Sequence, residues 1–333
     1  MHGQGQVPIG AGAGTRNGVL MSRFPVAPNA QEVLPMSRLL IAVLWVLAVT
    51  SVPSSAQPPL KVFISADMEG LAGAVTPEQL GPTGFEYGRF REFMTEEVIA
   101  AIEGAREAGA TEIVVADSHG NMQNLLIERL PADVTLVRGS PRPLSMMEGI
   151  DSTFAAAIFI GYHAAATNRQ GVRAHTMSSA RYAAVQLNGT PIAESGMNAA
   201  IAGHFGVPIV MVSGDDVAVA EVQALIPGVE GAVVKRALGF HAAASMTPEA
   251  ARALIRERAR AGVAKRAQIR PHRLQGPVRL ELTFKSYRPA EILAYLPIVE
   301  RTSDRTIAYT AASILEISRF LVFVGAYTVE LEP

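Results

Sequence analysis

Short apolar stretches alternate with longer segments of helical periodicity along the first two thirds of the chain. The longest helical pattern runs from Tyr87 to Ala108, with Gly109 as a helix stop. The apolar stretches contain β-branched residues and indicate buried strands at residues 61–66, 112–116, 134–137, 155–160 and 208–212. Nearly continuous apolar strands that alternate with helices predict a parallel sheet covered by helices on both faces.

The pattern changes after residue 230. A helix is predicted over 248–265, an alternating strand over 278–284 and a helix around 313–324. Six basic residues between Arg252 and Arg266 are interpreted as a solvated face of the first helix. Before this change, Asn188-Gly189 between two extended stretches predicts a hairpin. We therefore predict an α/β fold, with a mostly parallel sheet, helices on both faces and a smaller C-terminal α+β module.

The predicted elements divide the chain after residue 59 into two domains. Residues 60–230 are predicted to form the α/β metal-binding catalytic domain. Residues 231–333 are predicted to form the smaller α+β module, which completes the fold and supplies oligomer contacts.

The first 56 residues do not resemble a folded domain. Residues 1–35 are rich in Gly, Pro, Ala and Asn, which predicts an over-extended or disordered leader. Residues 36–56 have a basic start, an apolar run and small residues before Ala56, which is typical of a signal peptide. The apolar run is shorter than the roughly 20 residues that span a bilayer. We expect an exported protein, periplasmic or secreted, with no stable membrane anchor after signal cleavage.

The composition limits the kinds of site and partner that the chain can have. The chain has 333 residues, no cysteine, seven histidines and a formal charge of −1. The absence of cysteine excludes thiol catalysis, disulfides and thiolate metal sites. A charge near zero provides no attractive field for nucleic acid, so no nucleic-acid partner is expected. Any metal must be held by histidine and carboxylate side chains.

Such side chains follow the predicted strands. Asp67 and Glu69 come after the first strand, His119 after the second, His163 after a later one, and Glu194 ends the hairpin region. Ligands of open parallel sheets bind at the carboxyl ends of the strands. Alternate residues of an extended chain point the same way, so two adjacent carboxylates would repel each other unless a cation lay between them. Five candidate ligands suited to zinc or manganese indicate two metal ions with a bridging carboxylate.

The same residues lie in longer motifs, in order along nearly all of the chain from Lys61. The motifs include Ser-Ala-Asp-Met-Glu-Gly from Ser65, Ala-Asp-Ser-His-Gly-Asn-Met from Ala116, Gly-Tyr-His from Gly161, Ala-His-Thr-Met from Ala174 and Ala-Glu-Ser-Gly-Met-Asn from Ala193. This series resembles the zinc-dependent D-aminopeptidase family of dipeptide-transport operons.

The resemblance implies a dinuclear-zinc aminopeptidase. It would hydrolyse short peptides with an N-terminal D-amino acid, of the D-Ala-D-Ala type, by metal-activated water. It implies two Zn²⁺ per subunit and a homo-oligomer, a decamer. It also implies metal ligation by Asp67, Glu69, His119, His163 and Glu194, with His175 as a catalytic residue outside the metal shell.

Some assignments remain open from the sequence alone. Asn198 lies one turn beyond Glu194 if a helix begins there, and is expected to contact substrate. One alternative function is a metal-dependent amidase or aminopeptidase for L-peptides. Another is a non-catalytic exported dipeptide-binding protein, although residues after 230 do not repeat the first part as a two-lobed binder would require.

Overall fold

The computed structural model describes residues 25–26 and 59–327. Apart from residues 25–26, the predictions for the leader at 1–35 and for the signal peptide at 36–56 lie outside the described residues. In the part of the chain that is described, no helix combines the length and the apolar character needed to cross a membrane.

The larger sheet has seven strands in the order β3-β2-β1-β4-β7-β8-β9. The first six are parallel, and β9 runs antiparallel to β8. The strands are β1 (Lys61–Ala66), β2 (Glu112–Asp117), β3 (Val134–Val137), β4 (Ala156–Tyr162), β7 (Ile209–Asp215), β8 (Glu230–Gly239) and β9 (Ala242–Ser245). The predicted parallel sheet is confirmed.

The strand order reverses between β1 and β4. The chain runs outward from β1 to β2 and β3, and then returns to form β4 on the other side of β1. In open parallel sheets, such a reversal creates a crevice at the carboxyl ends of the two strands, where ligands bind. The topology therefore marks the ends of β1 and β4 as a binding position.

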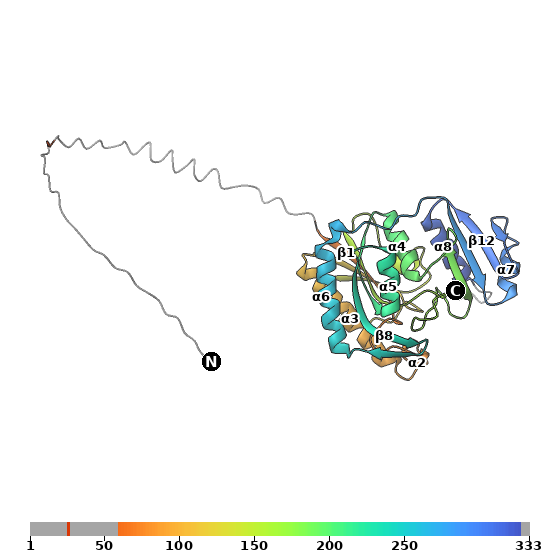
Figure 1. The fold of residues 1–333 in the computed structure, drawn as a ribbon, viewed down its shortest axis with the longest axis horizontal. Coiled ribbons are helices and arrows are strands. Elements are labelled where there is room, and N and C mark those ends of the chain that lie inside the picture. Colours follow the sequence, from red (N-terminus) through yellow and green to blue (C-terminus); the bar gives the residue numbers. More distant parts are fainter. Residues whose placement is uncertain (1–24, 27–58, 328–333) are drawn as a thin grey trace, which may run out of the picture. The chain divides into compact units, whose positions relative to one another are not determined.

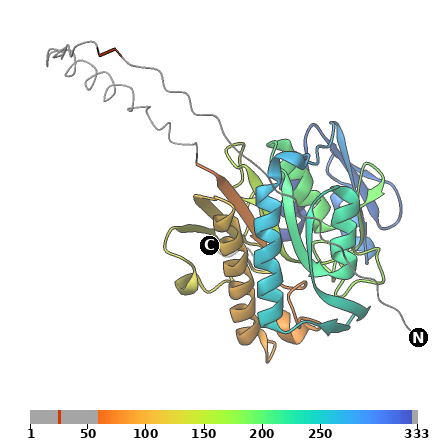
Figure 2. The ribbon, with the colours of Figure 1, turned by 60° about the vertical axis from the view of Figure 1, so that its left-hand side comes forward.

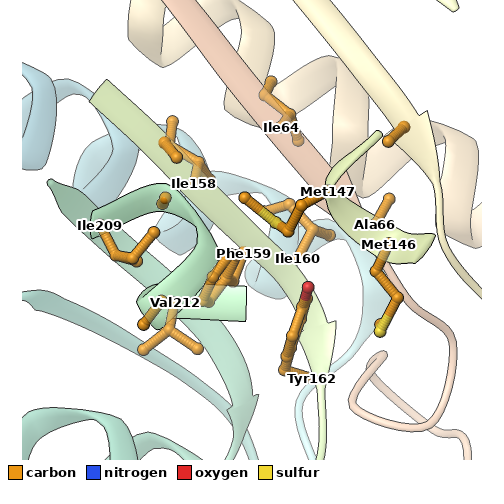
Figure 3. Close-up of a cluster of buried hydrophobic side chains, with 14 of the residues drawn as sticks. Ile64, Ala66, Met146, Met147, Ile158, Phe159, Ile160, Tyr162, Ile209 and Val212 are labelled. Carbon is orange, nitrogen blue, oxygen red and sulfur yellow. The ribbon is translucent and has the colours of Figure 1, made fainter. Parts of the chain in front are cut away.

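The centre of this sheet is buried and mostly apolar. Every position of β4 and β7 is buried, as are five of the six positions of β1. Figure 3 shows Ile64, Ile158 and Val212 from these strands beside Met146 and Met147 of the short segment η2 (Ser145–Met147). The continuous hydrophobic runs of the sequence are explained by this burial on both faces.

Helices cover both faces of the large sheet. On one face α3 (Tyr87–Glu107) and α6 (Pro248–Ala264) lie side by side, as Figures 1 and 2 show. Gly104 permits this close approach, because a Cβ there would lie 2.2 Å from the Arg256 carbonyl oxygen. The other face is covered by α4 (Glu194–His204) and α5 (Asp216–Leu225), and the short helix α2 (Pro77–Leu80) precedes α3.

A second, antiparallel sheet has the order β11-β12-β10-β5-β6. The predicted hairpin forms its β5–β6 edge, where Asn188 and Gly189 both have positive φ, 49° and 77°, as a type I′ turn requires. The elements are β5 (Tyr182–Leu187), β6 (Thr190–Pro191), β10 (Val278–Phe284), β11 (Val299–Arg301) and β12 (Thr306–Ala311), with α7 (Tyr287–Leu293) and α8 (Ile314–Ala326) against them. Two further 3₁₀ turns are η1 (Ile127–Arg129) and η3 (Arg266–Gln268).

The predicted division at residue 230 does not follow the two sheets. β8, β9 and α6 begin at or after this point, yet they complete the large sheet and its helical cover. Conversely, β5 and β6 precede it and belong to the small sheet, where Leu187 of β5 pairs with Leu280 of β10. The division is corrected because strand pairing over some 90 residues leaves no local signal in the sequence.

Candidate metal centre and active site

The predicted metal ligands converge at the carboxyl edge of the large sheet. Asp67 directly follows β1, His119 comes two residues after β2, and His163 directly follows β4. Glu194 is the first residue of α4. All four, together with Glu69, are buried. Two of them, Asp67 and His163, therefore flank the point where the strand order reverses.

Their polar atoms lie within contact distance. The His119 Nδ1 atom is 3.1 Å from Asp67 Oδ1 and 3.0 Å from Glu69 Oε2. The His163 Nε2 atom is 3.4 Å from both Asp67 Oδ2 and Glu194 Oε1. One buried cluster therefore contains three carboxylates and two imidazoles.

Two glycines allow the ends of β1 and β4 to come this close. The Gly70 N–H donates to the Gly161 carbonyl oxygen at 2.7 Å. Gly161 has a φ of +70°, and a Cβ on it would lie 2.2 Å from the Asp67 carbonyl oxygen. A Cβ on Gly70 would lie 2.1 Å from the Tyr162 carbonyl oxygen. Any larger residue at either position would push the Asp67–Gly70 loop away from His163.

A buried lysine also holds the Asp67–Gly70 loop in position. The Lys235 ammonium group on β8 donates to the carbonyl oxygens of Glu69, Leu71 (3.0 Å) and Ala74 (2.5 Å), which uses all three of its protons. Burial lowers the pKa of Lys235 to about 8. The Glu97 carboxylate accepts from the Ala72 N–H at 3.0 Å. The backbone that carries Glu69 is thus held by side chains of β8 and α3.

The loop after β2 is held by Asp117. Its carboxylate accepts from the N–H groups of Asn124 and Leu125, at 2.5 and 2.7 Å, and from the Asn124 side chain at 2.8 Å. The His119 Nε2 atom lies 2.6 Å from the Leu80 carbonyl oxygen. This carbonyl accepts the Nε2 proton, so Nδ1 faces the carboxylates: it donates to them when protonated, and in the neutral ring it is the nitrogen that could bind a metal.

The carboxylates of the cluster lie close together, and this shifts their pKa values. Burial, with the neighbouring Glu69 carboxylate, raises the pKa of Asp67 to about 8. Burial also acts to raise the pKa of Glu69, but the adjacent His119 holds it well below its usual value. Burial opposes a charge on His163, whereas Glu194 and Asp67 raise its pKa to about 10. Without a metal ion, the side chains of the cluster can therefore balance their charges only by binding protons.

Two buried polar atoms of the cluster have no hydrogen-bond partner among the described residues: Asp67 Oδ2 and His163 Nε2. Buried polar atoms are nearly always partnered, so this pair indicates a missing ligand. Two groups of side chains bring their ligand atoms within 4.8 Å of one another: Asp67, Glu69 and His163, and His163, His175 and Glu194. Carboxylate oxygens and imidazole nitrogens are suitable ligands for zinc, so the donor set fits this metal.

The structure places His175 against the same cluster. Its ring is stacked on that of His163, with ring centroids 4.0 Å apart and an interplanar angle of 9°. The His175 Nδ1 atom lies 2.8 Å from the Arg173 carbonyl oxygen, which assigns the proton to Nδ1, and Nε2 is 3.7 Å from Glu194 Oε1. Burial and the neighbouring His163 lower the pKa of His175. The Nε2 atom of the neutral ring is therefore a proton acceptor beside the candidate ligands.

A cavity of about 400 Å³ opens onto this cluster. Asp67, Glu69, His119, His175 and Glu194 line it. The remaining wall includes several serines and methionines, two arginines that the sequence analysis did not single out (Arg142 and Arg181), and the C-terminal part of α8. The volume is in the range of small-molecule sites, which suits a short peptide.

Asn198 does not line this cavity. It is on α4, as predicted, but its side-chain amide donates to the Tyr162 hydroxyl at 2.9 Å and contacts the Met146 sulfur at 3.2 Å. The Tyr162 hydroxyl in turn contacts Ser65 Oγ at 2.7 Å. The expected substrate contact is corrected, because a helical turn beyond Glu194 points Asn198 into a buried polar chain beneath the cavity.

Comparisons with known proteins agree with this arrangement. A family model described as D-aminopeptidase matches residues 60–323. A D-aminopeptidase of Bacillus subtilis (strain 168) is 36% identical over 261 residues, which are 77% of this chain and 93% of that protein. A solved structure described as the Zn-dependent D-aminopeptidase DppA from Bacillus subtilis, a self-compartmentalizing protease, has a TM-score of 0.77 and 33% sequence identity. That match covers 82% of this chain and 100% of the solved chain, and it supports the mixed α/β fold.

Proposed function

The chain belongs to the D-aminopeptidase family, whose members are peptide hydrolases, and we propose that it removes an N-terminal D-amino acid from short peptides of the D-Ala-D-Ala type. We further propose that it uses two zinc ions, held by Asp67, Glu69, His119, His163 and Glu194. The observation that carries the proposal is the buried cluster at the cavity, where Asp67 Oδ2 and His163 Nε2 have no partner among the described residues.

The metal chemistry follows from the donor set. Zinc supplies a Lewis acid that polarises a carbonyl group and activates water near neutral pH. Asp67, Glu69, His119, His163 and Glu194 would supply three carboxylates and two imidazoles to the two ions. The three acidic residues would also neutralise part of the positive charge of the ions.

The protein side chains have distinct roles in this proposal. Asp67, Glu69 and Glu194, together with His119 and His163, would hold the zinc ions at the end of the cavity. His175, with its Nδ1 proton bound to the Arg173 carbonyl oxygen, presents Nε2 to accept a proton and then return it to the amine that leaves. Water adds across the peptide bond, so that the C–N bond breaks and a carboxylate and a free amine are formed.

We also propose that the protein is exported and forms a homo-oligomer, a decamer. Export is supported by the pattern of residues 36–56 alone. Oligomer formation is supported by large apolar side chains that are exposed near α7 and the end of α8: Tyr287, Ile292, Tyr295, Ile298, Phe323 and Tyr327. It is also supported by the description of the DppA structure as self-compartmentalizing.

The activity is tested with the purified enzyme and two dipeptides, D-Ala-D-Ala and L-Ala-L-Ala. We expect D-alanine release with a kcat/KM roughly 100-fold above that for the L-peptide, within the range that pocket shape can supply. Chelator treatment should abolish the activity, zinc should restore it, and elemental analysis should find two zinc ions per subunit. Preference for the L-peptide would favour the alternative aminopeptidase, and inactivity of the zinc-loaded enzyme on both peptides would contradict the proposal.

A further inference from the structure

The cavity wall carries positive charge in addition to the candidate metal ligands. Arg142 and Arg181 both line the cavity, whereas its acidic lining residues are the three carboxylates of the cluster. A short peptide with free ends has a positive amino terminus and a negative carboxyl terminus. Because these carboxylates are assigned to the metal ions, the two arginines are the groups of the wall that can meet the negative carboxyl terminus.

The two arginines differ in how many donors remain available. Arg142 is buried and donates to the carbonyl oxygens of Ser145 (3.1 Å), Val137 (3.2 Å) and Asp117 (2.9 Å) from its three nitrogens. Each of its three nitrogens thus has a backbone partner, although one N–H on each Nη atom makes no bond within the described residues. Arg142 is accordingly a structural clamp.

Arg181 is anchored by one nitrogen only. Its Nη1 atom donates to the carbonyl oxygens of Val324 (3.3 Å) and Gly325 at the end of α8. Its backbone is fixed on both sides, since the Arg181 N–H donates to Ser178 (3.2 Å) and its carbonyl oxygen accepts from the Lys285 N–H (2.9 Å). Its Nε and Nη2 atoms make no hydrogen bond within residues 59–327. These two nitrogens form one edge of the guanidinium fork, the geometry that binds a carboxylate in a bidentate manner.

We propose that Arg181 binds the C-terminal carboxylate of the peptide, so that the enzyme selects short peptides with a free carboxyl terminus. This inference rests on the proposed function and specifies its substrate class. A carboxylate that enters the cavity loses water and requires a charged partner, and Arg181 is the arginine of the wall whose Nε and Nη2 atoms both lack a partner among the described residues. A longer or amidated peptide cannot place a charged carboxylate at this position.

The experiment compares D-Ala-D-Ala with its C-terminal amide, D-Ala-D-Ala-NH₂, by D-alanine release from the zinc-loaded enzyme. We expect the wild-type kcat/KM to be about 10- to 100-fold higher for the free acid, the size of effect that a hydrogen bond to a charged group produces. Arg181→Gln should lose this preference, because its kcat/KM for the free acid falls toward its value for the amide. Arg181→Lys, which keeps the charge without the fork, should retain part of the preference. The exposed Arg270, outside the cavity, provides the control Arg270→Gln with an unchanged preference.

The outcomes separate this inference from the proposed function. A wild-type enzyme that hydrolyses both peptides equally well would overturn the role of Arg181 and leave the D-aminopeptidase activity intact. The role of Arg181 would also be overturned if Arg181→Gln kept the preference, or if its kcat/KM fell equally for both peptides. Inactivity of the wild type on both peptides would overturn the proposed function together with this inference. The wild-type comparison decides the point even if a variant fails to fold.

Discussion

The α3–α6 helix pair and the candidate metal centre gather charged side chains in opposite ways. Between the helices, basic residues of α6 face acidic residues of α3: Arg252 pairs with Glu96, and Arg256 lies 3.1 Å from Glu103. These side chains are one quarter to one half exposed. At the centre, three buried carboxylates share two histidines, and polar atoms remain without partners among the described residues.

This difference indicates what each region needs from outside the chain. The arginines of α6 need no partner from outside the chain, because each of them pairs with an acid of the same protein and solvent screens the remaining charge. The centre is incomplete, because burial of like charges is unfavourable until a cation joins them. Charges that are matched within the chain stabilise the fold, whereas buried charges that are unmatched mark a site for an external partner.

The largest effect is expected from Glu69→Gln, which keeps the shape of the side chain and removes one charge. Zinc affinity should fall by at least about 100-fold, because changes to residues that only support a ligand already cost 10- to 100-fold. The metal-free variant should melt at a lower temperature than metal-free wild type, because His119 stabilises the charged Glu69 carboxylate and holds its pKa well below the usual value. Elemental analysis and thermal melting with and without zinc measure both effects.

A matched control for this change is Glu78→Gln on α2, where the side chain is exposed and away from the cavity. Its zinc content and melting temperature should equal those of wild type in both states. Wild-type zinc content in the Glu69 variant would show that this carboxylate is not a ligand.

The convergence of the candidate ligands could be predicted from the sequence because its signals are local. Asp67 and His163 each follow an apolar run that is long enough to be a buried strand, and parallel strands end at the same edge of a sheet. The strands themselves were predicted to within a few residues for the same reason. The role of His175, in contrast, came only from the resemblance to a family, since no periodicity or spacing marks this loop residue.

The residues that support the centre could not be predicted in this way. Lys235 acts on carbonyl groups more than 160 positions earlier, and Arg181 meets α8 more than 140 positions later. Lys235 did leave a signal, because a lysine that follows Ala232, Val233 and Val234 in an apolar strand requires partners inside the protein. The basic residues of α6 are on an exposed face, as predicted, but their acidic partners on α3 lie about 150 positions away.

His175→Ala tests a smaller and different effect within the centre. If His175 moves a proton and does not hold metal, zinc content should stay at the wild-type level while kcat/KM falls by roughly 10²- to 10⁴-fold. The control is His204→Ala, at the exposed end of α4, with wild-type activity. Loss of zinc would instead make His175 a ligand, as its place in one of the two ligand groups allows, and full activity would remove it from the mechanism.

The smallest effect is expected from the helix pair. Arg252→Ala removes a pair whose two side chains are 32% and 27% exposed, and Glu96 retains Arg129 at 3.0 Å. The free energy of unfolding should fall by at most about 1 kcal/mol, and the difference from wild type should shrink in high salt. Zinc content should not change.

Chemical denaturation at low and high salt measures the free energy of unfolding. The control is Arg138→Ala, at an exposed arginine without an ion pair among the described residues. A larger loss of stability that persists in salt would mean that the helix pair resembles the buried centre after all, and that exposure alone does not separate the two regions.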